Sequence, residues 1–525
     1  MPARTNLHHL LSQAVAETPN ASALTYRGMT ISYFETWRRC NAATAQLLGV
    51  GLQRGDRVAI YLEKRFETVT SIFAVSAAGG VFVPINHVLK ATQVGHILGD
   101  SAARVLVTSA DRLAQLASVL AETHVEHVIV VGDAGLEVPA PWTVHSWDDQ
   151  GLLSRDRDIP HVIDIDPAAI LYTSGSTGQP KGVVLSHRNL IVGAESVCSY
   201  LKNTSDDVIL SVLPLSFDAG LSQVTTAFSA GAHCILMNYL LPREVPRLCE
   251  QYGVTGITGV PPLWLQLADV AWPLAVAGRL RYWANTGGRM PRPTLDRLRG
   301  IFTEADPYLM YGLTEAFRST YLDPAEIDRR PDSIGKAIPN AEILVLRPDG
   351  VRCDPGEEGE LVHRGALVAL GYWNDPMRTA ERYRPVHHAG QDWRAPERAV
   401  WSGDRVVADD EGFLYFVGRR DDMIKTSGYR VSPNEIEEAA HNTGLVRDAV
   451  AMGLDDPALG QRIVLMATPV ADALDVDALT AALKRVLPLY MVPSLIEVRD
   501  ELPRSPNGKY DRNSLRSELL LEVSR

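Results

Sequence analysis

The sequence has few cysteines and no long uncharged apolar run. Its five cysteines form no CxxC pair; they are Cys40, Cys198, Cys234, Cys249 and Cys353. This scatter excludes a disulfide framework and a zinc site of paired cysteines, and it is typical of a reducing compartment. The N-terminus lacks the apolar core and cleavage site of a signal peptide, and no apolar run is long enough to span a bilayer. We therefore expect a cytoplasmic protein with no membrane partner.

The chain also lacks an excess of basic residues. Lys and Arg total 51 against 63 Asp and Glu, which gives a formal net charge of -12. A nucleic-acid-binding surface needs a basic face, so we expect no nucleic-acid partner. With 46% hydrophobic and 22% charged residues the composition is that of a globular protein. A chain of 525 residues is too long for one core and predicts two or more domains.

Short apolar runs alternate with helical patterns through the first two thirds of the chain. Runs such as 57–62 and 81–85 are separated by segments with apolar residues at helical spacing. This rhythm predicts parallel sheets covered by helices. From about Ala341 the pattern changes to hairpin-like pieces with an Asp-Gly turn signal. The predicted fold class is α/β, with a large N-terminal domain (1–420) of parallel-sheet subdomains plus a small β subdomain, and a small α+β C-terminal domain (421–525).

A stretch rich in Gly, Ser and Thr runs from Thr173 to Lys181, between an expected strand and a helix with Ser186 as its N-cap. Glycines let the backbone approach an anion, while hydroxyls and the lysine add donors and charge. The P-loop of nucleotide triphosphatases requires Gly-Lys-Ser/Thr at a helix start. Here Pro180 precedes the lysine and Gly182 follows it, so that alternative fails. We predict a phosphate-binding loop rather than an ordinary polar turn.

Five motifs, taken together, resemble those of the adenylate-forming enzymes: acyl-CoA synthetases, luciferases and the adenylation domains of peptide synthetases. They are YTSGSTGQPKG (172–182), YGLTE (311–315), WSGDRV (401–406), GRRDDMIKTSGYRVSPNEIE (418–437) and PNGKYDR (506–512). One such motif would be weak evidence, but five in the family's order and spacing identify the chain as a member of this superfamily. It is most similar to stand-alone amino-acid adenylation enzymes of non-ribosomal peptide and polyketide pathways.

The resemblance implies that a carboxylate is joined to the α-phosphate of ATP with loss of pyrophosphate, and that the acyl group then passes to a thiol. ATP and Mg²⁺ are the implied cofactors. The residues implied to cradle the β- and γ-phosphates are Thr173, Ser174, Gly175, Ser176, Thr177, Gly178 and Lys181. Thr314 would contact the α-phosphate. Glu315 would hold Mg²⁺, which prefers carboxylate and phosphate oxygens.

The same resemblance places the nucleoside. Tyr311 would stack on adenine, and Asp404 would accept both ribose hydroxyls, a role suited to two acceptor oxygens. Arg419 would assist at the ribose. The backbone segment beside the adenine would include Gly287, Gly288 and Arg289.

The resemblance also implies a mobile C-terminal domain. Lys509 would reach the α-phosphate and the substrate carboxylate while the adenylate forms. Asp421 aligns with the family's hinge, where a few positions absorb the backbone rotation. Gly428 would approach the tunnel for the thiol after the rotation. Taken alone, Asp404 and Lys509 would be turn residues more often than catalysts, and only the joint pattern of motifs overturns that interpretation.

Phe217-Asp218 follows the amino-acid pattern of peptide-synthetase adenylation domains, in which the carboxylate pairs with the substrate's ammonium group. An ammonium that enters an enclosed pocket loses its hydration, and a paired carboxylate compensates. Many acyl-CoA synthetases carry a His-containing motif at this place instead. The structural alternative is that Asp218 caps the following helix.

The remaining acid-pocket positions come from the resemblance; they are Ser222, Gly259, Ala284, Met310, Arg318 and Ser319. Most are small, so bulk must come from the substrate or from Met310 and neighbouring side chains. Arg318 is the exception, because it could bind a second carboxylate of an aspartate-like acid by a bidentate contact. Equally, it could be structural and pair with Asp332 or Glu342, and the structural interpretation is slightly favoured.

The chain ends soon after the lysine motif and carries no carrier-protein signature, so the acyl group would go to a separate acceptor. The leading hypothesis is ATP-dependent adenylation of a small amino acid (a β-amino, aspartate-like or proline-like acid) and transfer to the pantetheine thiol of a separate carrier protein. The main alternative is an AMP-forming acyl-CoA ligase for a non-amino acid. A third hypothesis, an inactive relative that acts as an interaction protein, is disfavoured by the intact motifs.

Overall fold

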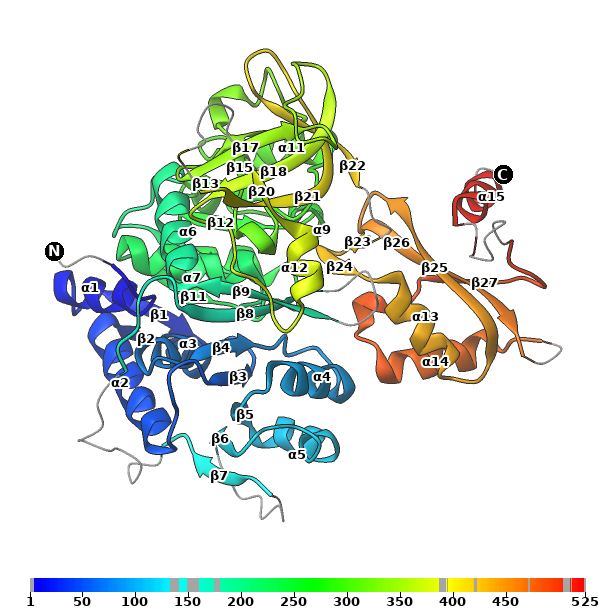
Figure 1. Cartoon of the computed structure of the whole chain (residues 1–525). Coiled ribbons are helices and arrows are strands. Elements are labelled where there is room, and N and C mark those ends of the chain that lie inside the picture. Colours follow the sequence, from blue (N-terminus) through cyan, green and yellow to red (C-terminus); the bar gives the residue numbers. More distant parts are fainter. Residues whose placement is uncertain are drawn as a thin grey trace.

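The structure is a computed structural model in which one large body carries a smaller one at its side (Figure 1). It describes residues 4–132, 141–148, 160–173, 180–386, 393, 395–419, 423–470, 473–503, 510 and 512–523. The predicted class is confirmed: the chain is mixed α/β, with a large N-terminal domain and a smaller C-terminal domain.

The helices of the described residues fall mostly between strands. In chain order they are α1 (His9–Glu17), α2 (Tyr33–Gly49), α3 (Phe66–Ala77), α4 (Ala91–Ser101), α5 (Ala110–Leu120), α6 (His187–Tyr200), α7 (Asp218–Ala230), α8 (Glu244–Tyr252), α9 (Pro261–Ala268), α10 (Leu274–Ala277), α11 (Arg292–Ile301), α12 (Pro376–Arg382), α13 (Pro433–His441), α14 (Val476–Val486) and α15 (Arg512–Val523). Short 3₁₀ helices are η2 (Thr314–Ala316), η3 (Pro324–Glu326) and η4 (Leu489–Met491). The expected N-cap of α6 is confirmed, because Ser186 Oγ accepts a hydrogen bond from the backbone N–H of Asn189.

Two sheets form the N-terminal domain. Within the described residues the first has eight strands in the order β19 (Gly371–Tyr372), β9 (Lys181–Ser186), β8 (Pro167–Thr173), β4 (Val81–Pro84), β3 (Arg57–Tyr61), β5 (Val105–Ser109), β6 (His127–Val131) and β7 (Thr143–Ser146). The strands from β8 to β7 in this order pair in parallel, as predicted, and β9 adds an antiparallel edge.

The second sheet is longer and changes character along its width. Its order is β17 (Ala341–Leu346), β18 (Glu358–Gly365), β21 (Glu397–Ala408), β22 (Leu414–Arg419), β16 (Ser333–Ala337), β15 (Thr320–Leu322), β14 (Asp306–Tyr311), β13 (Tyr282–Asn285), β12 (Gly256–Gly259), β10 (Val208–Ser211), β11 (His233–Leu236), β1 (Ser22–Tyr26) and β2 (Met29–Ser32), with β20 (Tyr383–Val386) on β21. Strands β14 to β1 pair in parallel, whereas β15 to β17 pair antiparallel, so the predicted small β subdomain is an extension of this sheet.

The main core lies between these two sheets. Helices α3 and α7 bury nearly every side chain there, which explains why their sequences are apolar or small on all faces rather than on one stripe. Two further buried clusters cover the opposite faces of these sheets, so the parallel strands are buried on both faces and read as continuous apolar runs.

The C-terminal domain has a sheet of its own. Its strands are β24 (Tyr429–Val431), β23 (Ile424–Thr426), β26 (Gly460–Pro469), β25 (Val446–Asp456) and β27 (Leu495–Val498). Helices α13 and α14 pack against one face of this sheet and α15 against the other. Strand β24 and helix α13 lie toward the N-terminal domain, and α15 lies away from it (Figure 1).

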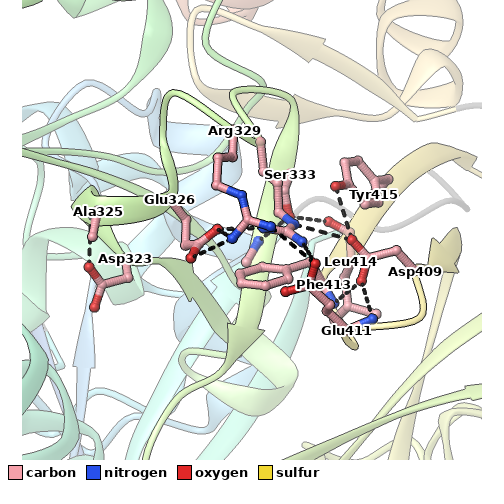
Figure 2. A network of polar contacts seen from close by, with 12 residues as sticks. Asp323, Ala325, Glu326, Arg329, Ser333, Asp409, Glu411, Phe413, Leu414 and Tyr415 are labelled. Atoms are coloured by element: carbon pink, nitrogen blue, oxygen red, sulfur yellow. Dashed lines mark hydrogen bonds and ion pairs between the residues drawn. The ribbon is translucent and has the colours of Figure 1, made fainter.

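A polar network fastens the β subdomain to the segment after η3. Arg330 is only 8% exposed and contacts three carboxylates, those of Glu326, Asp409 and Glu411. Its guanidinium also stacks on the ring of Phe413, 4.1 Å from the centroid. Figure 2 shows these acids and the ring gathered from both segments. Such a buried cation is tolerated because its charge is fully paired.

Candidate active site

A cavity of about 470 Å³ lies between the two domains. The N-terminal domain contributes walls made of segments that follow the carboxyl ends of parallel strands in both sheets. This is the usual place for ligands in open α/β sheets. Of the residues predicted from sequence, nine border it: Thr173, Phe217, Asp218, Gly287, Thr314, Glu315, Arg318, Asp404 and Gly428. Residues scattered over more than 200 positions are therefore brought to one space.

Lys181 and Glu315 meet at one end of this cavity. Lys181 Nζ lies 3.3 Å from Glu315 Oε1 and 2.6 Å from the hydroxyl of Tyr372, which in turn donates to Glu315 Oε1 at 2.6 Å. Arg382 Nη2 lies 4.0 Å from the same carboxylate oxygen. Sequence analysis missed Tyr372 and Arg382, because they lie outside the five motifs.

Charge balance in this cluster sets its protonation. Burial lowers the pKa of Lys181 to about 8, although the neighbouring Glu315 carboxylate opposes the shift. Burial also disfavours the Glu315 carboxylate, but the cations of Lys181 and Arg382 outweigh it and hold the pKa of Glu315 far below its ordinary range. Glu315 is thus an ionised carboxylate that is 2% exposed, beside a cation that titrates near neutral pH.

Asp404 lies on β21 at a second side of the cavity. Its Oδ2 accepts a hydrogen bond from the hydroxyl of Tyr311 at 2.5 Å. Across the ladder, Asp404 is in register with Arg419 on β22, so the two residues expected at the ribose are cross-strand neighbours. The Arg419 side chain lies outside the described residues.

Asp218 is the first residue of α7 and faces the cavity. Phe217, not Asp218, occupies the N-cap position, and its side chain makes no capping hydrogen bond. Asp218 is therefore not the N-cap residue. Burial raises the pKa of its carboxyl, whereas the nearby Arg318 guanidinium and the backbone N–H groups of Asp218 and Ala219 at the start of α7 lower it.

The other predicted acid-pocket positions do not border the main cavity, apart from Arg318. Ser222 and Met310 border a second void of about 10 Å³, which Arg318 also borders. The indole of Trp264 fills the space beside Gly259 and donates to the carbonyl oxygen of Ala284. Two further predicted positions also have protein partners, Ser319 with His363 at 2.9 Å and Arg289 with Asp332 at 2.5 Å. Gly288 lies beside Pro261.

The suggested structural pairing of Arg318 is wrong. Asp332 pairs with Arg289, and Glu342 pairs with Arg352 and Arg364. The acids that were assigned to Arg318 are therefore engaged elsewhere on the surface.

The C-terminal domain closes the cavity with β24 and α13. Gly428 has φ +80°, and a Cβ there would lie 2.9 Å from Val260 Cγ2 of the N-terminal domain, so only glycine fits this close approach. The ring of Tyr429 packs edge-on against Phe217, with centroids 5.2 Å apart. Gln93 Nε2 donates to Glu435 Oε1 at 3.0 Å. Gly428 was expected here, but Tyr429 and Glu435 were not singled out, although they lie within the fourth motif.

Lys64 is a further cavity residue that sequence analysis missed. Its buried ammonium donates to the carbonyl oxygens of Ser211 and Leu213, both at 2.8 Å, and burial lowers its pKa to about 7. A lone lysine after a strand carries no signal that it will be buried. Several predicted residues lie outside the described ranges: Ser174, Gly175, Ser176, Thr177, Gly178, Asp421 and Lys509.

Two family models match the chain. The AMP-binding enzyme model covers residues 11–373, and the AMP-binding enzyme C-terminal domain model covers residues 435–509. The chain belongs to the AMP-binding, adenylate-forming enzyme family.

Named relatives of this family differ in the acid and the thiol that they use. The chain is 34% identical to an L-proline–[L-prolyl-carrier protein] ligase of Streptomyces coelicolor over 92% of its length and 91% of the relative. It is 30% identical to a long-chain-fatty-acid–CoA ligase of Escherichia coli O157:H7, over 98% of this chain and 94% of the relative. Family membership therefore leaves the acid and its acceptor open.

One solved relative occurs in two ligand states. The o-succinylbenzoate CoA synthetase of Bacillus subtilis is 25% identical and matches with TM-score 0.82 when bound with its product analogue, with 97% of this chain and 98% of that chain covered. With its acyl-adenylate intermediate bound, the same enzyme matches with TM-score 0.67, with 97% of each chain covered. Within the ranges described above, no helix is both long and apolar enough to cross a membrane.

Proposed function

We propose that this enzyme adenylates a small amino acid with ATP and transfers the aminoacyl group to the phosphopantetheine thiol of a separate carrier protein. The observation that carries the proposal is the position of Asp218, which borders the cavity from the first residue of α7. A carboxylate partly withdrawn from water in that place favours a substrate ammonium as its partner. The similarity to a prolyl-carrier protein ligase supports the same class of substrate and acceptor.

In the first step an oxygen of the substrate carboxylate attacks the α-phosphorus of ATP. The P–O bond to the β-phosphate breaks, and pyrophosphate leaves with the electron pair. We assign the triphosphate to the loop that ends at Lys181, the α-phosphate to Thr314, and the ribose to Asp404. Lys509 would neutralise the charge that accumulates between the two reacting anions, because such catalysis is mainly positioning and electrostatic stabilisation.

The residues present fit a Mg²⁺ ion that arrives with ATP. Mg²⁺ is commonly bound by one or two carboxylates together with substrate phosphates, and Glu315 is an ionised carboxylate at the phosphate end of the cavity. Among the residues described above, no group of three or more His, Cys, Asp or Glu side chains forms a metal cage, which agrees with an ion held largely by the nucleotide. The ion would neutralise phosphate charge.

In the second step the thiolate sulfur attacks the acyl carbon of the adenylate. The C–O bond to AMP breaks, AMP leaves, and the thiol proton has been released to solvent. The position of Gly428 and Tyr429 suits this step, because both residues bring the C-terminal domain into close contact with the N-terminal wall of the cavity. The better match to the relative bound with its product analogue supports this assignment.

The alternative is an AMP-forming acyl-CoA ligase for a plain carboxylic acid, which the similarity to the fatty-acid ligase favours. ATP–pyrophosphate exchange across amino acids, aryl acids and fatty acids separates the two. We expect exchange with amino acids. The Lys509→Ala variant should lose this exchange but still bind ATP. Exchange with plain acids alone, or acyl transfer to CoA but to no carrier protein, would refute the proposal.

A further inference from the structure

Two arginines of this chain are both buried but differ in their charge partners. Arg330, 8% exposed, contacts three carboxylates. Arg318 is 3% exposed, and among the described residues its side chain makes one hydrogen bond, from Nη1 to Thr286 Oγ1 at 3.1 Å. Its Nε is buried without an acceptor, and no described carboxylate oxygen lies within 4.0 Å of the guanidinium. A guanidinium withdrawn from water is unfavourable unless an anion pairs with it.

The backbone before Arg318 is held in an unusual conformation. Phe317 has φ +54° and ψ −52°, a region that bulky residues rarely adopt. Its ring is fully buried and packs so closely on Gly193 that a Cβ there would lie 2.4 Å from Phe317 Cδ1. After this turn the chain runs back alongside β14 toward β15, and the backbone N–H of Ser319 donates to the carbonyl oxygen of Tyr311. The strain places Arg318 against the cavity, and such strain concentrates at functional sites.

The position of Arg318 separates it from the nucleotide residues. It borders both the main cavity and the small void that Ser222 and Met310 line, whereas Thr173 and Asp404 border the main cavity alone. Phosphate charge has its own cations at Lys181 and Arg382. The anion that Arg318 lacks is therefore expected on the acid side of the cavity.

Asp218 borders the same cavity, but no nitrogen of the Arg318 side chain lies within 4.0 Å of its carboxylate oxygens, so the two charges do not form an ion pair. They remain close enough for Arg318 to influence the carboxylate electrostatically. A ligand between them would meet an anion on one side and a cation on the other. A plain amino acid supplies an ammonium for the first, but its single carboxylate must reach the α-phosphate.

We propose that Arg318, with the Thr286 hydroxyl, forms a specificity site for a second carboxylate on the amino-acid substrate, an inference that rests on the proposed function. The guanidinium fork matches a carboxylate by two parallel hydrogen bonds, and Thr286 fixes its orientation. The substrate class is then an amino dicarboxylic acid, bound by its ammonium at Asp218 and by its non-reacting carboxylate at Arg318.

Matched acids and variants test this site. ATP–pyrophosphate exchange is measured with aspartate, glutamate, their amides, alanine, β-alanine and succinate on the wild type, Arg318→Gln and Arg318→Lys. Arg330→Gln is the control, because it removes a buried guanidinium that borders neither cavity. We expect the wild type to prefer an acidic amino acid over its amide by at least about 100-fold in kcat/KM, since a site built for a polar group rejects the analogue that lacks it.

The variants should change this ratio in a defined way. Arg318→Gln should lower kcat/KM for the dicarboxylate by about 100-fold and change that for neutral amino acids less than about threefold. Arg318→Lys should recover only part of the loss, because the fork is missing. Arg330→Gln should keep the wild-type ratio.

Other outcomes are equally informative. Equal use of acidic and neutral amino acids by the wild type would overturn the inference and leave the proposed function standing. A folded Arg318→Gln that loses all acids alike would also overturn it, because Arg318 would then serve the reacting carboxylate. Exchange with succinate equal to that with aspartate would support the second-carboxylate site and refute the amino-acid part of the proposed function. If the Arg318 variants do not fold, thermal shifts of the wild type decide: stabilisation by the dicarboxylate and not by its amide supports the site, and equal shifts refute it.

Discussion

Glu435 is the acidic group that the contact between the two domains buries. It lies on α13, accepts a hydrogen bond from Gln93 of α4, and borders the cavity beside Tyr490. Burial raises the pKa of Glu435 from 4.5 to about 7, with Glu438 adding to the shift and Gln93 opposing it. We predict that Glu435→Gln strengthens the docked arrangement at neutral and alkaline pH.

The magnitude follows from the shift. One pKa unit corresponds to about 1.4 kcal/mol, so a rise from 4.5 to about 7 makes docking at most about 3 kcal/mol less favourable once the carboxyl is ionised, the limit reached when all of the shift comes from the contact between the domains. Because the docked state holds the proton more tightly, docking is most favourable below pH 4.5, weakens as the pH rises to 7, and is constant above that. Between pH 6 and 8 the linkage equation gives, at this limit, a loss of about 1.3 kcal/mol, or roughly tenfold in the docking equilibrium.

Small-angle X-ray scattering on the whole chain at pH 6 and pH 8 measures the compact fraction. The wild type should be less compact at pH 8, whereas Glu435→Gln should be equally compact at both. Glu438→Gln is the matched control: it removes an exposed carboxylate from the same helix and should retain the wild-type pH dependence. A pH dependence that persists in Glu435→Gln, or that disappears equally in Glu438→Gln, would refute the role of Glu435.

Three further predictions concern the cavity itself. Because burial lowers the pKa of Lys181 to about 8 in the free enzyme, kcat/KM for ATP should fall about tenfold per pH unit above 8, and a profile flat to pH 9.5 contradicts this. Asp218→Asn should lower kcat/KM for the amino acid by at least about 100-fold with the KM of ATP unchanged, since it removes a buried charge partner; equal losses for both substrates would indicate a structural role. In Gly428→Ala the new side chain would be strained by φ +80° and blocked by Val260. The variant should therefore form the thioester at least about tenfold more slowly but keep pyrophosphate exchange within about threefold of the wild type, and quenched-flow measurement of both steps tests this.

Local patterns were sufficient to predict most of the fold. The apolar runs from Arg57 and Val81 become β3 and β4, and the Ser186 cap begins α6, because these features depend on neighbours in sequence. The small β subdomain was predicted as a separate unit, yet it continues the sheet through β15 and β16. A strand pairing between distant segments has no local signature, which is why this continuity was not foreseen.

The two halves of the site differ in what the sequence can predict. Residues expected at the ribose, Asp404 and Arg419, are neighbours because a β ladder fixes their register. The acid pocket depends instead on which side chain fills which space. The small residues left open whether the substrate or neighbouring side chains supply the bulk, and beside Gly259 it is the Trp264 side chain. The acids expected near Arg318 pair elsewhere.

This difference has a physical cause that bears on substrate choice within the family. Phosphates are bound by backbone N–H groups and a few charges, so their site can be written in contiguous motifs. An acid pocket is defined by packing, and one strained residue such as Phe317 decides whether the next side chain faces protein or ligand. Arg318 acquires its significance from that turn and from the absence of an acid within 4.0 Å among the residues described, neither of which its sequence context reveals. The proposed substrate class of this chain therefore rests on unpaired buried charge and not on the size of its pocket residues.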